Sequence, residues 1–80
     1  MSSLPAESEP LAVSVRFDAD SFVVRLADGR ELSVRYAWFP SLLNASPEDR
    51  ADYRLVGDGI GIHWPRIDED LSTAGLLRGR

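Results

Sequence analysis

The side chain in this sequence with the most possible chemical roles is that of its one histidine, His63. A histidine can act as a general base or bind a metal ion, and both roles need partner residues. The chain has no cysteine and no second histidine, so carboxylates alone could complete a zinc site. Two interpretations follow: His63 is structural or faces solvent, or it makes a pH-sensitive contact at an interface.

Three consecutive acids, Asp68, Glu69 and Asp70, form the second group that could bind a ligand. They resemble half of a calcium loop, but the glycine at the sixth position and the closing glutamate of such a loop are absent. Paired carboxylates in a glycosidase need a sugar-binding cleft, for which a chain of 80 residues has little room. We therefore expect solvated charge that leads into a final helix, and neither a metal ion nor another cofactor.

The glycine-rich segment Gly57-x-Gly59-x-Gly61 could in principle hold a phosphate group. A phosphate-binding loop, however, carries a Lys-Ser/Thr pair and joins a strand to a helix. This segment lacks the pair and is predicted to join two strands, so its glycines indicate a β-hairpin.

Arginines at alternating positions of the predicted strands could form a basic stripe. Arg16, Arg25 and Arg35 fall on outward positions. Such a stripe could bind an acidic partner or, together with aromatic side chains, single-stranded nucleic acid. The alternative is a solvated face of cross-strand pairs, such as Arg25 opposite Glu31.

Composition limits the classes of function further. A chain of 80 residues forms one small domain. Its net charge of −4, from 13 acids and nine bases, disfavours direct binding to nucleic acid. The sequence shows no cysteine, no signal peptide and no apolar run near the roughly 20 residues that span a bilayer, which predicts a cytoplasmic protein without a membrane segment.

Hydrophobic alternation predicts three strands in the first half of the chain. They follow a flexible tail, residues 1–11, and begin a single domain, residues 12–80. In the first strand the alternation turns Val13, Val15 and Phe17 toward the core. The three predicted strands cover residues 12–17, 22–26 and 32–36.

The loop between the second and third of these strands decides their register. A two-residue turn at Asp28-Gly29 would put the apolar sets of the two strands on opposite faces. A three-residue loop that ends in Gly29 at positive φ would instead set Val24 opposite Leu32. We expect the three-residue loop.

The second half of the chain contains signals for short helices. Apolar residues at helical spacing predict a helix or 3₁₀ turn over about residues 39–44. Ser46 and Pro47 mark the start of a second helix, and Ser72 marks the start of a third.

A second hairpin is predicted between these helices. A type I′ turn at Asp58-Gly59 would pair Leu55 with Ile62 and turn both side chains inward. Arg54 and His63 would then share the outward face. Both apolar strands agree on this register without a bulge.

The most apolar segment contains Trp38 and Phe39. In one interpretation this segment closes one end of the sheet and completes the core. In the other, its aromatic side chains are exposed and bind a partner.

Several short motifs follow one another along residues 12–77. They are Leu26-Ala27-Asp28-Gly29-Arg30, Trp38-Phe39-Pro40-Ser41-Leu42, Val56-Gly57-Asp58-Gly59, Ile62-His63-Trp64-Pro65 and Asp70-Leu71-Ser72. In this order they resemble the small bacterial family known as domain of unknown function 2442. One departure is Thr73, because the family often has proline after this serine.

The resemblance implies a compact α+β domain with an antiparallel sheet and without established catalytic residues. It also implies a genomic neighbour, since members are often encoded beside another small uncharacterised protein. That arrangement has prompted the suggestion of a toxin–antitoxin-like pair.

We therefore predict an α+β fold, with a small antiparallel sheet of about five strands in two hairpins and two or three short helices. We expect a non-enzymatic protein-interaction module that binds another small protein, and an antitoxin-like partner of a neighbouring protein is its specific form. The candidate interaction surface is Arg35, Trp38, Phe39 and His63. The alternative is a nucleic-acid-linked transcriptional regulator that uses the arginine stripe. The sequence leaves the oligomeric state open.

Overall fold

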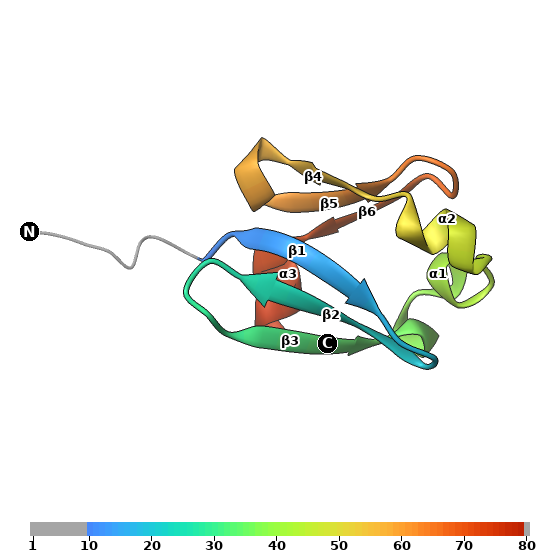
Figure 1. The fold of residues 1–80 in the computed structure, drawn as a ribbon, viewed down its shortest axis with the longest axis horizontal. Helices are drawn as coiled ribbons and strands as arrows, with labels where there is room; N and C mark the ends of the chain where they lie inside the picture. The colour runs from blue at the N-terminus through green and yellow to red at the C-terminus, as the bar shows by residue number, and fades with distance from the viewer. Residues whose placement is uncertain (1–9, 80) are drawn as a thin grey trace, which may run out of the picture.

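The computed structural model describes residues 10–79, so residues 1–9 of the predicted tail lie outside the described residues. In the described chain, six strands form two antiparallel sheets with the orders β1-β2-β3 and β4-β5-β6 (Figure 1). The α+β class is confirmed, although the strands number six in two sheets, against about five expected in one. The strands are β1 (Ala12–Phe17), β2 (Ser21–Leu26), β3 (Glu31–Arg35), β4 (Arg54–Val56), β5 (Gly61–Trp64) and β6 (Glu69–Ser72). The helices are α1 (Pro40–Leu43), α2 (Pro47–Ala51) and α3 (Thr73–Arg78), and the 3₁₀ turns are η2 (Tyr36–Trp38) and η3 (Gly57–Gly59).

The hairpin of β2 and β3 has the predicted three-residue loop. Gly29 has φ of 95°, and Val24 lies opposite Leu32. Asp28 helps to fix the loop, because its carboxylate accepts a hydrogen bond from the Arg30 amide at 3.0 Å. The same contact lowers the pKa of Asp28 below its ordinary value, since the amide bond favours the charged carboxylate.

The prediction for the start of β1 was wrong at Val13. A bulge between Ala12 and Ser14 shifts the register there, so Ala12 is buried while Val13 is 48% exposed. Beyond the bulge the predicted alternation resumes, and Val15 and Phe17 pack against the core. One extra residue reverses the inward face of the strand because side chains alternate with a period of two.

The second hairpin has the predicted register but not the predicted burial of both strands. Leu55 lies opposite Ile62, and Arg54 lies opposite His63. Asp58 and Gly59 have φ of 60° and 106°, as a type I′ turn requires. Ile62 is buried, whereas Leu55 is exposed, because β4 lies at the edge of its sheet.

The acidic run belongs to a strand, which corrects the expectation that it leads as solvated charge into the last helix. Asp68 has φ of 53° and ends a turn, and β6 then pairs with β5, with Asp70 opposite His63 and Leu71 opposite Ile62. Acidic residues are depleted in strands, so propensity did not reveal β6. The backbone pairing with β5 and the packing of Leu71 against the core outweigh the low strand propensity of the acidic residues.

All three predicted helix regions are confirmed. Helix α1 covers Pro40–Leu43. At α2 the Ser46 hydroxyl accepts a hydrogen bond from the Asp49 amide at 3.1 Å, and at α3 the Ser72 hydroxyl accepts one from the Gly75 amide at 2.8 Å. These bonds satisfy amides that a helix start leaves without an internal partner.

The core lies between the two sheets. Phe22 is at its centre, with its ring 5.8 Å from that of Tyr36 and 5.7 Å from that of Trp64. Arg50 of α2 joins the parts around it, because it lies over the Tyr36 ring and its backbone carbonyl accepts a hydrogen bond from the Trp64 indole at 2.9 Å. The buried apolar cluster consists of Ala12, Phe22, Val24, Leu26, Val34, Tyr36, Leu42, Ile62 and Trp64.

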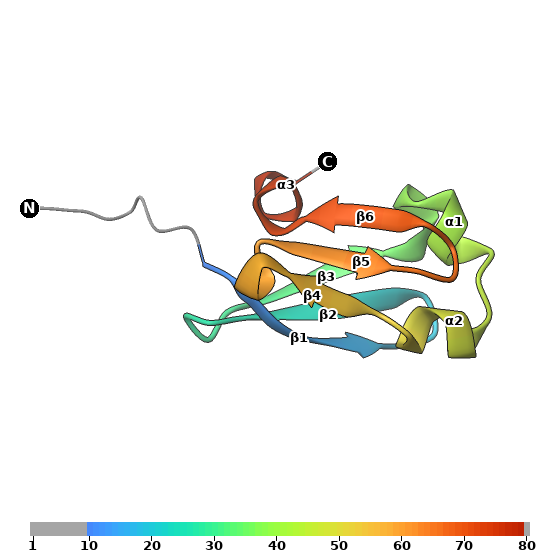
Figure 2. The same ribbon diagram turned by 90° about the horizontal axis from the view of Figure 1, so that it is seen from above.

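The two sheets are joined on two sides. On one side the Tyr53 hydroxyl, just before β4, accepts a hydrogen bond from the Val15 amide of β1 at 3.1 Å. On the other side α3 leaves β6 and crosses toward β3 (Figures 1 and 2). Helices α1 and α2 lie together at one end of both sheets (Figure 2). This arrangement leaves the outer face of each sheet without a covering helix in the described chain.

Candidate interaction surface

The structure places three of the four candidate residues in one short segment. Arg35 is exposed at the end of β3, and Trp38 is 42% exposed in η2. Phe39 is partly buried and packs against the core, so the segment combines both interpretations of its aromatic residues. His63 lies apart from this segment, on β5.

His63 forms a cross-strand pair with Asp70 on the outer face of the second sheet. Its Nδ1 atom lies 2.7 Å from the Asp70 carboxylate, and Arg54 is its neighbour on β4. A histidine in this position links two strands and faces solvent in part. The His63–Asp70 contact therefore has a structural role between β5 and β6. A partner that covers this face would also contact His63.

Arg16, Arg25 and Arg35 lie exposed on the outer face of the first sheet, and acids among them form the cross-strand pairs of the alternative interpretation. Arg25 lies opposite Glu31, and Arg16 lies 3.9 Å from Glu31 and 3.8 Å from Asp18. Such exposed pairs contribute little to stability. They do lower the positive potential that a phosphate backbone would meet.

An apolar hollow on the outer face of the second sheet was not anticipated. Val56 is 50% exposed and Ile60 is 62% exposed, and both flank Gly61 on the central strand. Because Gly61 has no side chain, the sheet is dented there, and the hollow has a volume of about 410 Å³. The residues that line it are Val56, Gly57, Ile60, Gly61, Ile62, Asp70, Leu71 and Ser72.

A signal for this hollow was present in the sequence. The predicted hairpin register already put Val56 and Gly61 opposite one another on the outward face. An exposed apolar residue beside a glycine on that face indicates an apolar surface patch without polar side chains over it.

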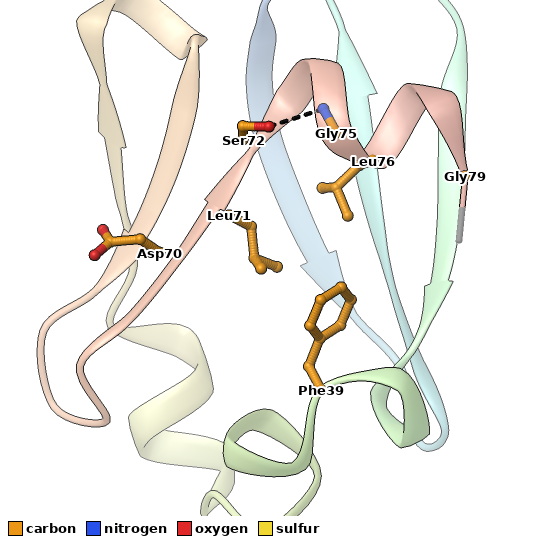
Figure 3. Close-up of a pocket in the computed structure, with 7 residues that line it drawn as sticks. All are labelled: Phe39, Asp70, Leu71, Ser72, Gly75, Leu76 and Gly79. Carbon is orange, nitrogen blue, oxygen red and sulfur yellow. Dashed lines mark hydrogen bonds between the residues drawn. The ribbon is translucent and has the colours of Figure 1, made fainter.

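A smaller groove runs along the free edge of β6 (Figure 3). It has a volume of about 230 Å³ and lies between that edge, α3 and Phe39. Leu71, Leu76 and Phe39 point into it, whereas the Asp70 carboxylate points away (Figure 3). The groove and the hollow share Asp70, Leu71 and Ser72, so β6 separates two concave surfaces.

The titratable groups in residues 10–79 do not gather into a metal site, since no three of His, Cys, Asp or Glu come together there. Burial raises the pKa of Tyr36, which lies in the core under Arg50. Asp28, whose pKa is lowered, lies in an exposed loop. No helix in the described chain is long and apolar enough to cross a membrane.

Comparison with known proteins identifies relatives over nearly the whole chain. Residues 12–80 match the profile of the family described as protein of unknown function DUF2442. The crystal structure of a protein of unknown function from Rhodospirillum rubrum ATCC 11170 superposes with a TM-score of 0.79 at 31% identity, covering 90% of this chain and 89% of that one. The solution structure of an uncharacterised protein from Chromobacterium violaceum gives a TM-score of 0.75 at 30% identity, covering 88% of this chain and 66% of that one. A search of curated proteins gives no match. The chain belongs to the DUF2442 family of proteins of unknown function.

Proposed function

We propose that this domain is a non-enzymatic protein-interaction module that binds another small protein through the apolar hollow around Gly61. The observation that carries the proposal is the exposure of Val56 and Ile60 at its rim. Exposed apolar side chains that surround a concave surface are typical of binding sites. No helix covers this face of β4, β5 and β6 in the described chain (Figure 1).

The rim of the hollow suits a protein partner. Asp70 and Ser72 lie beside the apolar residues, and Arg54 and His63 lie on the same face. An apolar centre with a polar rim is the usual composition of a protein interface. With a single histidine and no cysteine, the sequence offers few groups for catalysis.

A specific form of the proposal is an antitoxin-like role, in which the domain neutralises the product of the neighbouring gene. Its test is co-expression of the two proteins, with tagged recovery of this chain and measurement of host growth. The proposal expects a complex, and the antitoxin form also expects the neighbour alone to arrest growth. A complex without growth arrest would remove the antitoxin form, and the absence of a complex would remove the whole proposal.

The alternative function is nucleic-acid-linked regulation. It is supported by the exposure of Arg16, Arg25 and Arg35 on one face of the first sheet. Glu31 lies among these arginines and weakens the case. A gel-shift measurement at low salt distinguishes the two functions, because binding that falls as salt rises would support the alternative.

A further inference from the structure

The edge of β6 presents backbone groups without a partner strand in the described chain. Thr73 donates from its amide to the Ile60 carbonyl at 2.8 Å, in continuation of the pairing between β5 and β6. Hydrogen-bonded and non-hydrogen-bonded pairs alternate along an antiparallel ladder, so Leu71 bonds to Ile62 and the next residues on each side do not bond to β5. The amide and carbonyl of Asp70 and the amide of Ser72 therefore point toward the free edge.

The groove beside this edge has room for a side chain. Its volume of about 230 Å³ exceeds the roughly 150 Å³ of a protein cavity that holds benzene. Gly75 of α3 and Gly79, which follows the last residue of that helix, both line it, so its wall carries no side chain at either position. Leu71, Leu76 and Phe39 supply the apolar surface (Figure 3).

The two faces of β6 differ in a way that specifies an incoming strand. Leu71 faces the groove, and Asp70 faces away from it (Figure 3). A strand that paired with β6 would show the same alternation, with apolar side chains toward the groove and the others beside Asp70. The side chains beside Asp70 should be basic, because opposite charges on paired strands attract and like charges repel.

Charge also disfavours a second copy of this chain at the same edge. Glu69 and Asp70 both lie in β6, so two β6 strands paired with one another would bring four carboxylates to the same edge. Glu69 lies on the same face as Leu71 and accepts a hydrogen bond from Ser41, so a segment with lysine or arginine at alternate positions would complement Asp70 on the other face.

We propose that the free edge of β6 binds an extended segment of a partner protein in which basic and apolar residues alternate. The segment adds a strand to β4-β5-β6, puts an apolar side chain in the groove and sets a basic side chain beside Asp70. This inference rests on the proposed function and names the chemistry of its partner. Because β6 also borders the hollow around Gly61, a single partner can cover both surfaces.

The test uses a blocked synthetic peptide of strand length, about six residues, with alternating lysine and valine. Titration into the ¹⁵N-labelled full chain should shift the amide resonances of Asp70 and Ser72 and slow their hydrogen exchange. Two matched peptides separate the contributions. N-methylation of alternate backbone nitrogens removes the donors, and glutamate in place of lysine reverses the charge; each should weaken binding about tenfold.

A pair of protein variants tests the charge without altering the backbone. Asp70→Asn should weaken the lysine–valine peptide about threefold, whereas Asp58→Asn, which removes a charge in the turn after β4, should leave its affinity unchanged. The inference would be overturned if the N-methylated peptide bound as tightly as the unmodified one, or if the lysine–valine peptide did not bind. It would also be overturned if the amide resonance shifts were confined to strands other than β6. Failure of the inference remains distinct from failure of the proposed function. If the neighbouring protein forms a complex that Ile60→Ser weakens and Asp70→Asn does not, only the β6 edge is excluded.

Discussion

Gly59, in the turn between β4 and β5, lies directly against the backbone of Ala12 in β1. A Cβ atom at position 59 would overlap the carbonyl oxygen of Ala12, and the Gly59 φ of 106° disfavours any other residue. The Gly59 carbonyl in turn accepts a hydrogen bond from the Thr73 hydroxyl at 2.6 Å. One glycine thus joins the first sheet, the second hairpin and α3.

Substitution of this glycine should be far more damaging than substitution of a glycine in an open loop. Gly59→Ala combines backbone strain with a steric clash, so we expect it to lower the free energy of unfolding by at least about 3 kcal/mol. Gly29→Ala is the matched control, because Gly29 also has positive φ but a Cβ added there would meet no atom within 4 Å beyond its chain neighbours. Its cost should be about 1–2 kcal/mol. Urea unfolding measures both, and equal losses would contradict the role of the Ala12 contact.

The hydroxyl of Tyr53 should stabilise the seam between β1 and β4. Tyr53→Phe keeps the ring contact with Phe17, at 5.8 Å, and removes the bond from the Val15 amide. We expect a loss of about 1 kcal/mol and faster hydrogen exchange at the Val15 amide. Unchanged protection of that amide would show that the seam holds without the bond.

The first sheet shows how far sequence reasoning extends. The period of two and the glycine at position 29 were sufficient for the register of β2 and β3, because both are local signals. The bulge at Val13 was not predictable, since it arises where Gly59, distant in the chain, packs against β1. Tertiary contacts decide such positions, and the alternation of one strand cannot reveal them.

Tyr36 should make stability fall at alkaline pH. Burial raises its pKa above the ordinary value of 10.0, Arg50 acts in the opposite direction, and Asp18 adds to the rise. A group whose pKa is higher in the folded state contributes its full stability below the unfolded pKa, and this contribution is lost as pH rises through the folded pKa. The free energy of unfolding should therefore fall above pH 10.0, by at most about 1.4 kcal/mol per pH unit.

The control for this effect is Tyr36→Phe. The variant also loses the hydrogen bond from the Tyr36 hydroxyl to the Asp18 carbonyl, at 2.8 Å, so its stability should be lower at neutral pH. Its curve of unfolding free energy against pH should nevertheless be flatter above pH 10.0 than that of the wild type. Parallel curves would exclude Tyr36 as the cause.

Because Ser72 caps α3 at the Gly75 amide, substitutions at positions 72 and 75 should have coupled effects on the free energy of unfolding. Alanine is favoured over glycine in a helix by about 1 kcal/mol, but its Cβ at position 75 would lie 2.6 Å from the Ser72 hydroxyl. Gly75→Ala should therefore have little net effect in the wild type and should stabilise the Ser72→Ala background by about 0.5–1 kcal/mol. A double-mutant cycle by urea unfolding measures the coupling, and additive effects would contradict it.

The candidate surface was harder to predict than the fold. Arg35 is exposed because it falls on an outward position of the alternation, and Trp38 is 42% exposed, which was one of the two interpretations of its segment. The groove at β6 could not be predicted, because Glu69 and Asp70 give β6 no strand signal in the sequence. The strand forms by pairing with β5 in the folded chain. The hollow around Gly61 follows from the register of the second hairpin, which places Val56 opposite Gly61 on the outward face.

The central claim, that the hollow around Gly61 binds a small partner protein, is tested most directly by calorimetry with the purified product of the neighbouring gene. Ile60→Ser removes the most exposed apolar side chain at the rim, and Leu43→Ser, at 49% exposure on α1, is the matched control. The account predicts at least about tenfold weaker binding for Ile60→Ser and wild-type affinity for Leu43→Ser. Wild-type affinity for Ile60→Ser, or an equal loss for both variants, would contradict it.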